Sequence, residues 1–213
     1  MSALAGKLTL WWLNRRANTA LIFKRTEQAI AAYREMLAID PRYDYARIML
    51  GNLLAEAGDA AGAIRELEKL AEISPGNADG WFNLGFLHDK ADNAAEAERC
   101  FRRAVQLKPT LDRAWYGLGL VLIREGRLSE AVEALKANIK LQPFNPYGYY
   151  QLGMTYHHLG LVEEAWKVHE QLKGFEPKFS ATLKRDIERT PSRAKPSPDN
   201  LSHPKENAAA EAA

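Results

Sequence analysis

The sequence is poor in the features that build disulfide frameworks, metal clusters and membrane spans. Its 213 residues include a single cysteine, which excludes a disulfide framework and any site made of several cysteines. It has no uninterrupted apolar run of about 18 residues, so no segment is predicted to cross a membrane as a helix. The formal net charge of +2 gives no overall reason to bind nucleic acid, and we expect no nucleic-acid partner.

Patterns that support catalysis are also missing. Cys100 falls inside an apolar helical stretch, where an inert buried thiol is expected. His157 and His158 are adjacent, so their side chains do not share a face of a helix. This favours two polar surface residues over a metal site. Gly117 and Gly119 do not form a phosphate-binding loop. We predict a protein that is not an enzyme and has no cofactor and no metal.

The N-terminus does not have the pattern of a secretory signal. Its apolar run, residues 8–13, is shorter than the core of a signal peptide. Asn14, Arg15 and Arg16 follow the run, where small residues would mark a cleavage site. We therefore expect an unprocessed cytoplasmic protein.

Five of the ten prolines follow one another at intervals of 34 residues, at 41, 75, 109, 143 and 177. A fixed period of this size indicates a repeat architecture. The same period places an alanine at position 20 of every unit and a large apolar residue at position 30. The predicted repeat boundaries are 10–43, 44–77, 78–111, 112–145 and 146–179.

Each unit has the spacing of two amphipathic helices. Positions 4, 7, 8 and 11 form one stripe on a first helix, and positions 20, 24, 27 and 30 form one stripe on a second. Small residues at positions 8 and 20 allow the two helices to approach closely. Proline at position 32 cannot continue the second helix and ends the unit.

This pattern resembles the tetratricopeptide (TPR) repeat. The third unit carries the signature residues of that family, which are Trp81, Leu84, Gly85, Ala97, Phe101 and Pro109. The resemblance implies an all-α, right-handed superhelical solenoid of five helix-turn-helix repeats. Some positions depart from the pattern: Arg16 and Lys24 in the first unit, Arg47 in the second and Asn138 in the fourth.

A repeat array needs caps because one unit cannot bury its own apolar surface. Residues 1–9 are predicted to be an N-terminal extension. Residues 180–189 are predicted to be a capping helix, since Phe179, Leu183 and Ile187 recur four residues apart. The segment 190–213 is rich in proline and almost free of apolar residues, so we predict a disordered tail.

A second stripe on the first helices, at positions 5, 9 and 12, is largely apolar and aromatic in the last three repeats, and position 2 of the fifth repeat adds Tyr147. In the TPR family this face lines a concave groove that binds peptide segments of partner proteins. The resemblance therefore implies an adaptor or scaffold that binds a peptide or helical segment of another protein. The predicted groove residues are Phe82, Phe86, Tyr116, Leu120, Tyr147, Tyr150 and Met154. The alternative is that neighbouring first helices cover this stripe.

Polar residues of the same face resemble part of a carboxylate clamp found in some TPR proteins. Asn52, Asn83 and Arg113 fall where three clamp residues would lie, and they are predicted polar groove contacts. The two remaining clamp positions hold Ile48 and Gly117, which cannot pair with a carboxylate. A complete clamp is therefore not predicted.

The first 26 residues contain five basic residues and no acidic one. Two adjacent tryptophans lie inside this stretch. An alternative hypothesis is therefore a peripheral membrane-assembly factor whose N-terminal segment contacts an anionic membrane surface. The simpler interpretation is a capping helix with a solvated basic face, and an incompletely capped end would also allow self-association. The residues concerned are Lys7, Trp11, Trp12, Arg15, Arg16, Lys24 and Arg25.

Overall fold

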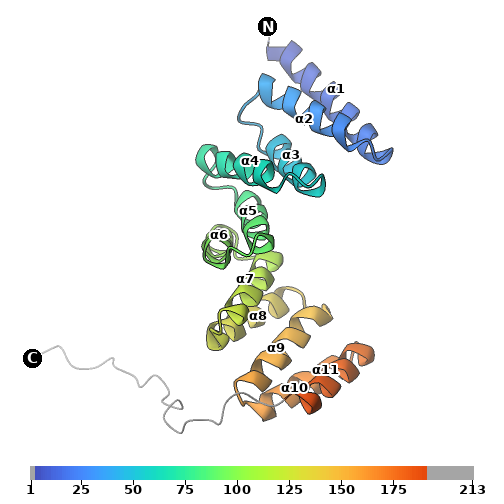
Figure 1. The fold of residues 1–213 in the computed structure, drawn as a ribbon. Helices are drawn as coiled ribbons and strands as arrows, with labels where there is room; N and C mark the ends of the chain where they lie inside the picture. Colours follow the sequence, from blue (N-terminus) through green and yellow to red (C-terminus); the bar gives the residue numbers. More distant parts are fainter. Residues whose placement is uncertain (1–2, 191–213) are drawn as a thin grey trace, which may run out of the picture.

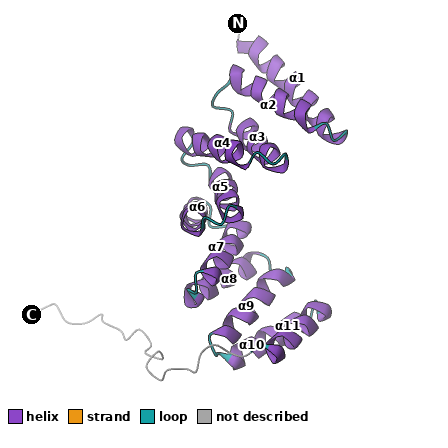
Figure 2. Ribbon diagram, viewed as in Figure 1, coloured by secondary structure: helices purple, strands orange, loops and turns teal. Residues whose placement is uncertain are grey.

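The computed structural model describes residues 3–190, with side chains described from residue 6 onward. These residues form a solenoid of antiparallel helix pairs and contain no strand (Figures 1 and 2). The predicted all-α solenoid is confirmed. The helices are α1 (Ala3–Ile22), α2 (Thr26–Ile39), α3 (Asp44–Glu56), α4 (Ala60–Ile73), α5 (Ala78–Lys90), α6 (Ala94–Leu107), α7 (Asp112–Arg124), α8 (Leu128–Leu141), α9 (Pro146–His158), α10 (Val162–Lys173) and α11 (Pro177–Arg189).

Tight turns join the two helices of each repeat. Gly58, Gly126 and Gly160 adopt positive φ angles of 88°, 76° and 77° in these turns. Lys24 and Asp92 take the equivalent place in the first and third repeats, with φ angles of 54° and 57°. The turn geometry is thus retained where glycine is absent, at a backbone cost that the surrounding packing must offset.

The two helices of a repeat approach each other at position 8. A Cβ atom placed on Gly85 would lie 3.0 Å from ring carbons of Phe101, and one on Gly119 would lie 2.9 Å from Leu135 side-chain carbons. The large residue at position 24 therefore packs directly on the glycine backbone. This explains the pairing of a small residue with a large one that recurs through the sequence.

A hydrogen bond repeats at the junctions between units. Trp81 Nε1 donates to the Pro75 carbonyl at 2.9 Å, and Trp115 Nε1 donates to the Pro109 carbonyl at 2.8 Å. The Tyr149 hydroxyl and the Arg47 guanidinium make the same bond to the prolines before them, Pro143 and Pro41, at 3.1 and 2.7 Å. Arg47 departs from the aromatic pattern, yet it keeps the donor that this position supplies.

The first and last helices both begin earlier in the sequence than predicted. α1 runs unbroken from Ala3, so the part of the predicted extension 1–9 that the structure describes belongs to the first helix. No proline or other break separates the two segments. α11 begins at Pro177, three residues before the predicted start of the capping helix at 180. The predicted disordered tail, 190–213, lies outside the described residues except for Thr190. No described helix is long and apolar enough to cross a membrane.

α11 packs on the last repeat through Leu183, which is fully buried. A Cβ atom on Gly153 would lie 2.7 Å from a methyl carbon of Leu183. In the earlier repeats this space over the glycine belongs to position 24 of the second helix. Repeat five has His169 at that position, and its imidazole pairs instead with the Ser180 hydroxyl at 2.8 Å.

Candidate groove on the concave face

The first helices of successive repeats line the inner face of the solenoid. α3, α5 and α7 each contact the first helix of the next repeat, whereas the second helices α4, α6, α8 and α10 do not contact one another. The chain is bent accordingly, and α6 lies on the outer side of the bend in Figure 1. The groove positions of the sequence therefore face the concave side.

Two open, adjoining hollows lie along this face. The first has a volume of about 580 Å³ between α3, α5 and the start of α7, and the second has about 440 Å³ between α5, α7 and α9. Phe82, Phe86 and Arg113 line both hollows, so the two form one continuous groove. We refer to the residues of both hollows as the groove.

Most of the predicted groove residues come together here. The first hollow contains Asn52 and Asn83, the second contains Tyr116, Leu120 and Tyr147, and the shared residues lie between them. Tyr150 and Met154 line neither hollow. The structure thus brings together eight of the ten predicted residues and separates two.

Cations flank the aromatic floor of the groove. The Arg113 guanidinium lies 4.6 Å from the ring centre of Phe82, and the Lys90 ammonium lies 4.9 Å from that of Phe86. Arg113 also reaches the Asp79 carboxylate at 3.6 Å. The sequence reasoning missed Lys90, although its place one helical turn after Phe86 indicates this contact.

The second hollow has an apolar wall and a polar base. Tyr116 is half-buried, and burial raises the pKa of its hydroxyl. Asn138 donates from Nδ2 to the Asp112 carbonyl at 2.9 Å. Its Oδ1 atom is buried and has no hydrogen-bond partner among the described residues. This oxygen faces the fifth repeat, because a Cβ atom on Gly148 would lie 2.5 Å from it.

At repeat five, α11 covers the stripe that lines the groove elsewhere. The Tyr150 hydroxyl donates to Asp186 Oδ2 of α11 at 2.8 Å, and this bond lowers the pKa of the Asp186 carboxyl. Met154 packs in the apolar cluster beneath the same helix. His157, expected at the surface, is buried, and its Nε2 lies 2.6 Å from the Thr190 carbonyl oxygen. The groove therefore ends at the start of α9, because α11 covers the rest of the stripe on that helix.

Outside the groove, three side chains with metal-ligand chemistry lie together in the third repeat. One donor atom from each of His88, Glu96 and Cys100 lies within 4.8 Å of the other two. Burial raises the pKa of the Cys100 thiol to about 11, so the thiol is protonated at neutral pH. Glu96 accepts a hydrogen bond from Arg99 Nε at 2.8 Å. Metal binding here would require loss of the thiol proton and of the arginine contact.

The fold and the groove define a helical-repeat protein with a hollowed concave face. Family models for the tetratricopeptide repeat match residues 20–70, 54–120 and 116–168. The chain belongs to the tetratricopeptide repeat family, as its repeat period predicts. No curated protein sequence matches it significantly.

Several solved structures share the solenoid. A MamA protein is 26% identical with a TM-score of 0.71, and the match covers 81% of this chain and 94% of MamA. YrrB, described as a TPR protein with an unusual peptide-binding site, is 24% identical with a TM-score of 0.67, covering 79% and 88%. PilF of Pseudomonas aeruginosa is 19% identical with a TM-score of 0.69, covering 87% and 93%. The likeness to YrrB and PilF is one of fold.

Proposed function

We propose that this protein is an adaptor or scaffold that binds a peptide or helical segment of a partner protein in the concave groove. The observation that carries the proposal is the exposure of large apolar side chains along two joined hollows. Phe86 is 43% exposed and Tyr147 is 58% exposed, although each lies on an ordered helix. Contiguous exposed apolar surface in a concave site is typical of protein interaction sites.

The groove favours a segment with apolar anchors and neighbouring acidic residues. Phe82 and Tyr116 offer aromatic contact area to an apolar side chain. Lys90 and Arg113 stand beside the aromatic floor and would attract a carboxylate in the bound segment. Glu56 also lines the first hollow, and its negative charge would repel an acidic residue of the bound segment at that end.

Rigidity supports binding through this face. The groove residues lie on helices whose first-to-second helix contacts are closely packed, as at Gly85 and Phe101. A preformed groove loses little conformational entropy when a ligand binds. Binding is also favoured over catalysis, because the groove offers no pairing of a nucleophile with a general base, and Asp89 is held by Arg124.

Selection of peptides from a random library on the full-length protein tests this function. We expect the selected peptides to share spaced aromatic or aliphatic residues with nearby Asp or Glu. Phe86→Ala with Tyr147→Ala should remove the selection, since both side chains are exposed and contribute little to the core. The matched control is Phe144→Ala with Leu161→Ala, which truncates exposed apolar residues outside the groove, 77% and 42% exposed. Equal enrichment on the groove variant and the control would reject the proposal.

A further inference from the structure

The end of the solenoid formed by α1 carries an exposed apolar surface that has no counterpart in the later repeats. Position 3 of the repeat is Ala46, Gly80, Ala114 and Gly148 in repeats two to five, and all four are buried. A Cβ atom on Gly80 would lie 2.6 Å from Leu70 of the preceding second helix. In the first repeat this position is Trp12, which is 61% exposed.

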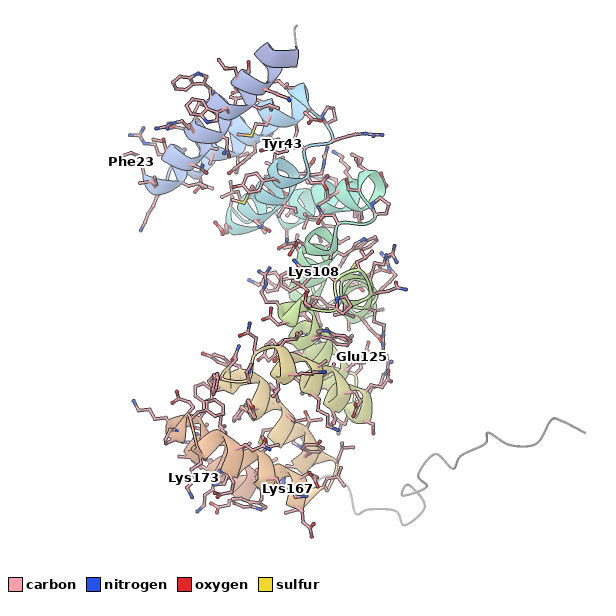
Figure 3. The ribbon with its side chains drawn as sticks, turned by 180° about the vertical axis from the view of Figure 1, so that it is seen from behind. Phe23, Tyr43, Lys108, Glu125, Lys167 and Lys173 are labelled. Atoms are coloured by element: carbon pink, nitrogen blue, oxygen red, sulfur yellow. The ribbon has the colours of Figure 1, made fainter. Side chains whose placement is uncertain are left out.

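Other large apolar side chains surround Trp12. At about 100° per residue, the exposed apolar residues of α1 fall within a sector of about 100° on that helix. The sector faces away from Leu13, Ala17 and Ala20, which pack on α2. Phe23 continues the surface just beyond α1, at the edge of the first helix pair in Figure 3. We call this surface the α1 face, and it consists of Leu8, Trp11, Trp12, Ile22 and Phe23.

The charge around the α1 face is positive. Residues 1–26 include five basic residues and no acidic residue. Arg15 lies 5.3 Å from the ring centre of Trp11, and Arg25 lies 5.7 Å from that of Phe23. Arg16 forms an ion pair with Glu35 at 2.8 Å, which neutralises one of the five positive charges. Arg15 and Arg25, which lie against these exposed rings, have no ion pair among the described residues, and neither do Lys7 and Lys24.

We propose that the α1 face binds the surface of a bilayer that contains anionic phospholipid. Exposed tryptophans flanked by Lys and Arg suit the boundary between headgroups and acyl chains. α1 lies at one end of the described solenoid, where it contacts α2 and no other described helix (Figure 1). This helix is about 30 Å long and can therefore lie along the membrane plane while the groove stays in water.

Two other occupants fit the observations less well. A stacked helix, as between repeats, needs a small residue at position 3, whereas Trp12 keeps another helix at a distance. A second copy stacked end to end would meet α11, which carries four basic and two acidic residues. Like charges would then oppose each other at the junction, as they would between two α1 faces.

Sedimentation of the full chain with vesicles tests the proposal. We expect binding to vesicles of phosphatidylcholine mixed with phosphatidylglycerol, and none to phosphatidylcholine alone. Trp11→Ala with Trp12→Ala should lower the partition coefficient by about tenfold or more because two indoles lose their burial. Arg15→Gln should lower it about fivefold, and Phe144→Ala should leave it unchanged. Circular dichroism verifies that each variant keeps its helices.

Several results would overturn this inference. Equal binding of the tryptophan variant, or equal binding to neutral vesicles, would show that the α1 face does not recognise an anionic surface. A dimer in lipid-free solution that dissociates on Trp12→Ala would assign the face to a second copy. A purified protein partner whose binding requires Trp12, without vesicle binding, would assign it to that partner. None of these results bears on the concave groove, which is tested separately.

Discussion

Truncation of Leu183 is predicted to detach the capping helix while the rest of the solenoid stays folded. This side chain is fully buried and rests on the backbone of Gly153, in the space that a second-helix residue fills elsewhere. Leu183→Ala removes three carbons, worth about 0.8 kcal/mol each, and leaves a cavity whose cost adds to this. We expect α11 to lose about 3 kcal/mol of stability.

The loss should be local because each repeat contacts only its neighbours. Hydrogen–deuterium exchange of the full chain measures it segment by segment. A cost of about 3 kcal/mol accelerates exchange in α11 by about a hundredfold, with little change in α3 and α4. Lys184→Ala, which truncates the exposed neighbouring side chain, should leave exchange in α11 nearly unchanged. Acceleration of less than about threefold in α11 would refute the packing role given to Leu183.

Three further predictions concern Gly117 in the fourth repeat and Cys100 in the third. Gly117→Ala should destabilise the protein by about 1 kcal/mol or more in urea unfolding, since the new Cβ would lie 2.7 Å from the Phe101 ring. Gly76→Ala, which has no neighbour within 4 Å, should stay within about 0.5 kcal/mol, and a larger loss there would contradict the steric reason. Cys100 should resist alkylation at pH 8 in the native chain and react once the chain is unfolded. Its thiol pKa rises from 9.0 to about 11 on folding, so this group's contribution should be complete below pH 9 and fall between pH 9 and 11. Cys100→Ala should flatten the stability profile over that interval, and an unchanged slope would assign it to other groups.

The ends of the second helices were predictable in the first four repeats, because the proline at position 32, two residues beyond each of them, cannot continue a helix. The role of Arg47 was harder to predict. The sequence shows it as a departure from an aromatic position, and only the fold reveals that the position supplies a donor to a proline carbonyl. Lys24 and Asp92 are similar, because the turn imposes a left-handed backbone on residues that do not favour it.

The groove was predictable in its centre and less so at its end. Helical spacing places Phe82, Phe86 and Tyr116 on one face of the first helices, and the resemblance to the TPR family implies that this face lines a groove. The contact between Tyr150 and Asp186 depends on how α11 docks on α9, and residue spacing within α11 does not specify that docking. The unpaired acceptor of Asn138 likewise depends on the neighbouring repeat, whose Gly148 approaches it closely.

The most direct test of the account is the dissociation constant of a library-selected peptide for three forms of the full chain. Isothermal titration should give an affinity that weakens about 30-fold or more for Phe86→Ala with Tyr147→Ala, as expected for two anchoring aromatic residues. The control Phe144→Ala with Leu161→Ala should bind like the wild type, and all three should keep the same melting temperature. Equal affinity in the groove variant and the wild type would contradict the assignment of the concave groove as the binding site.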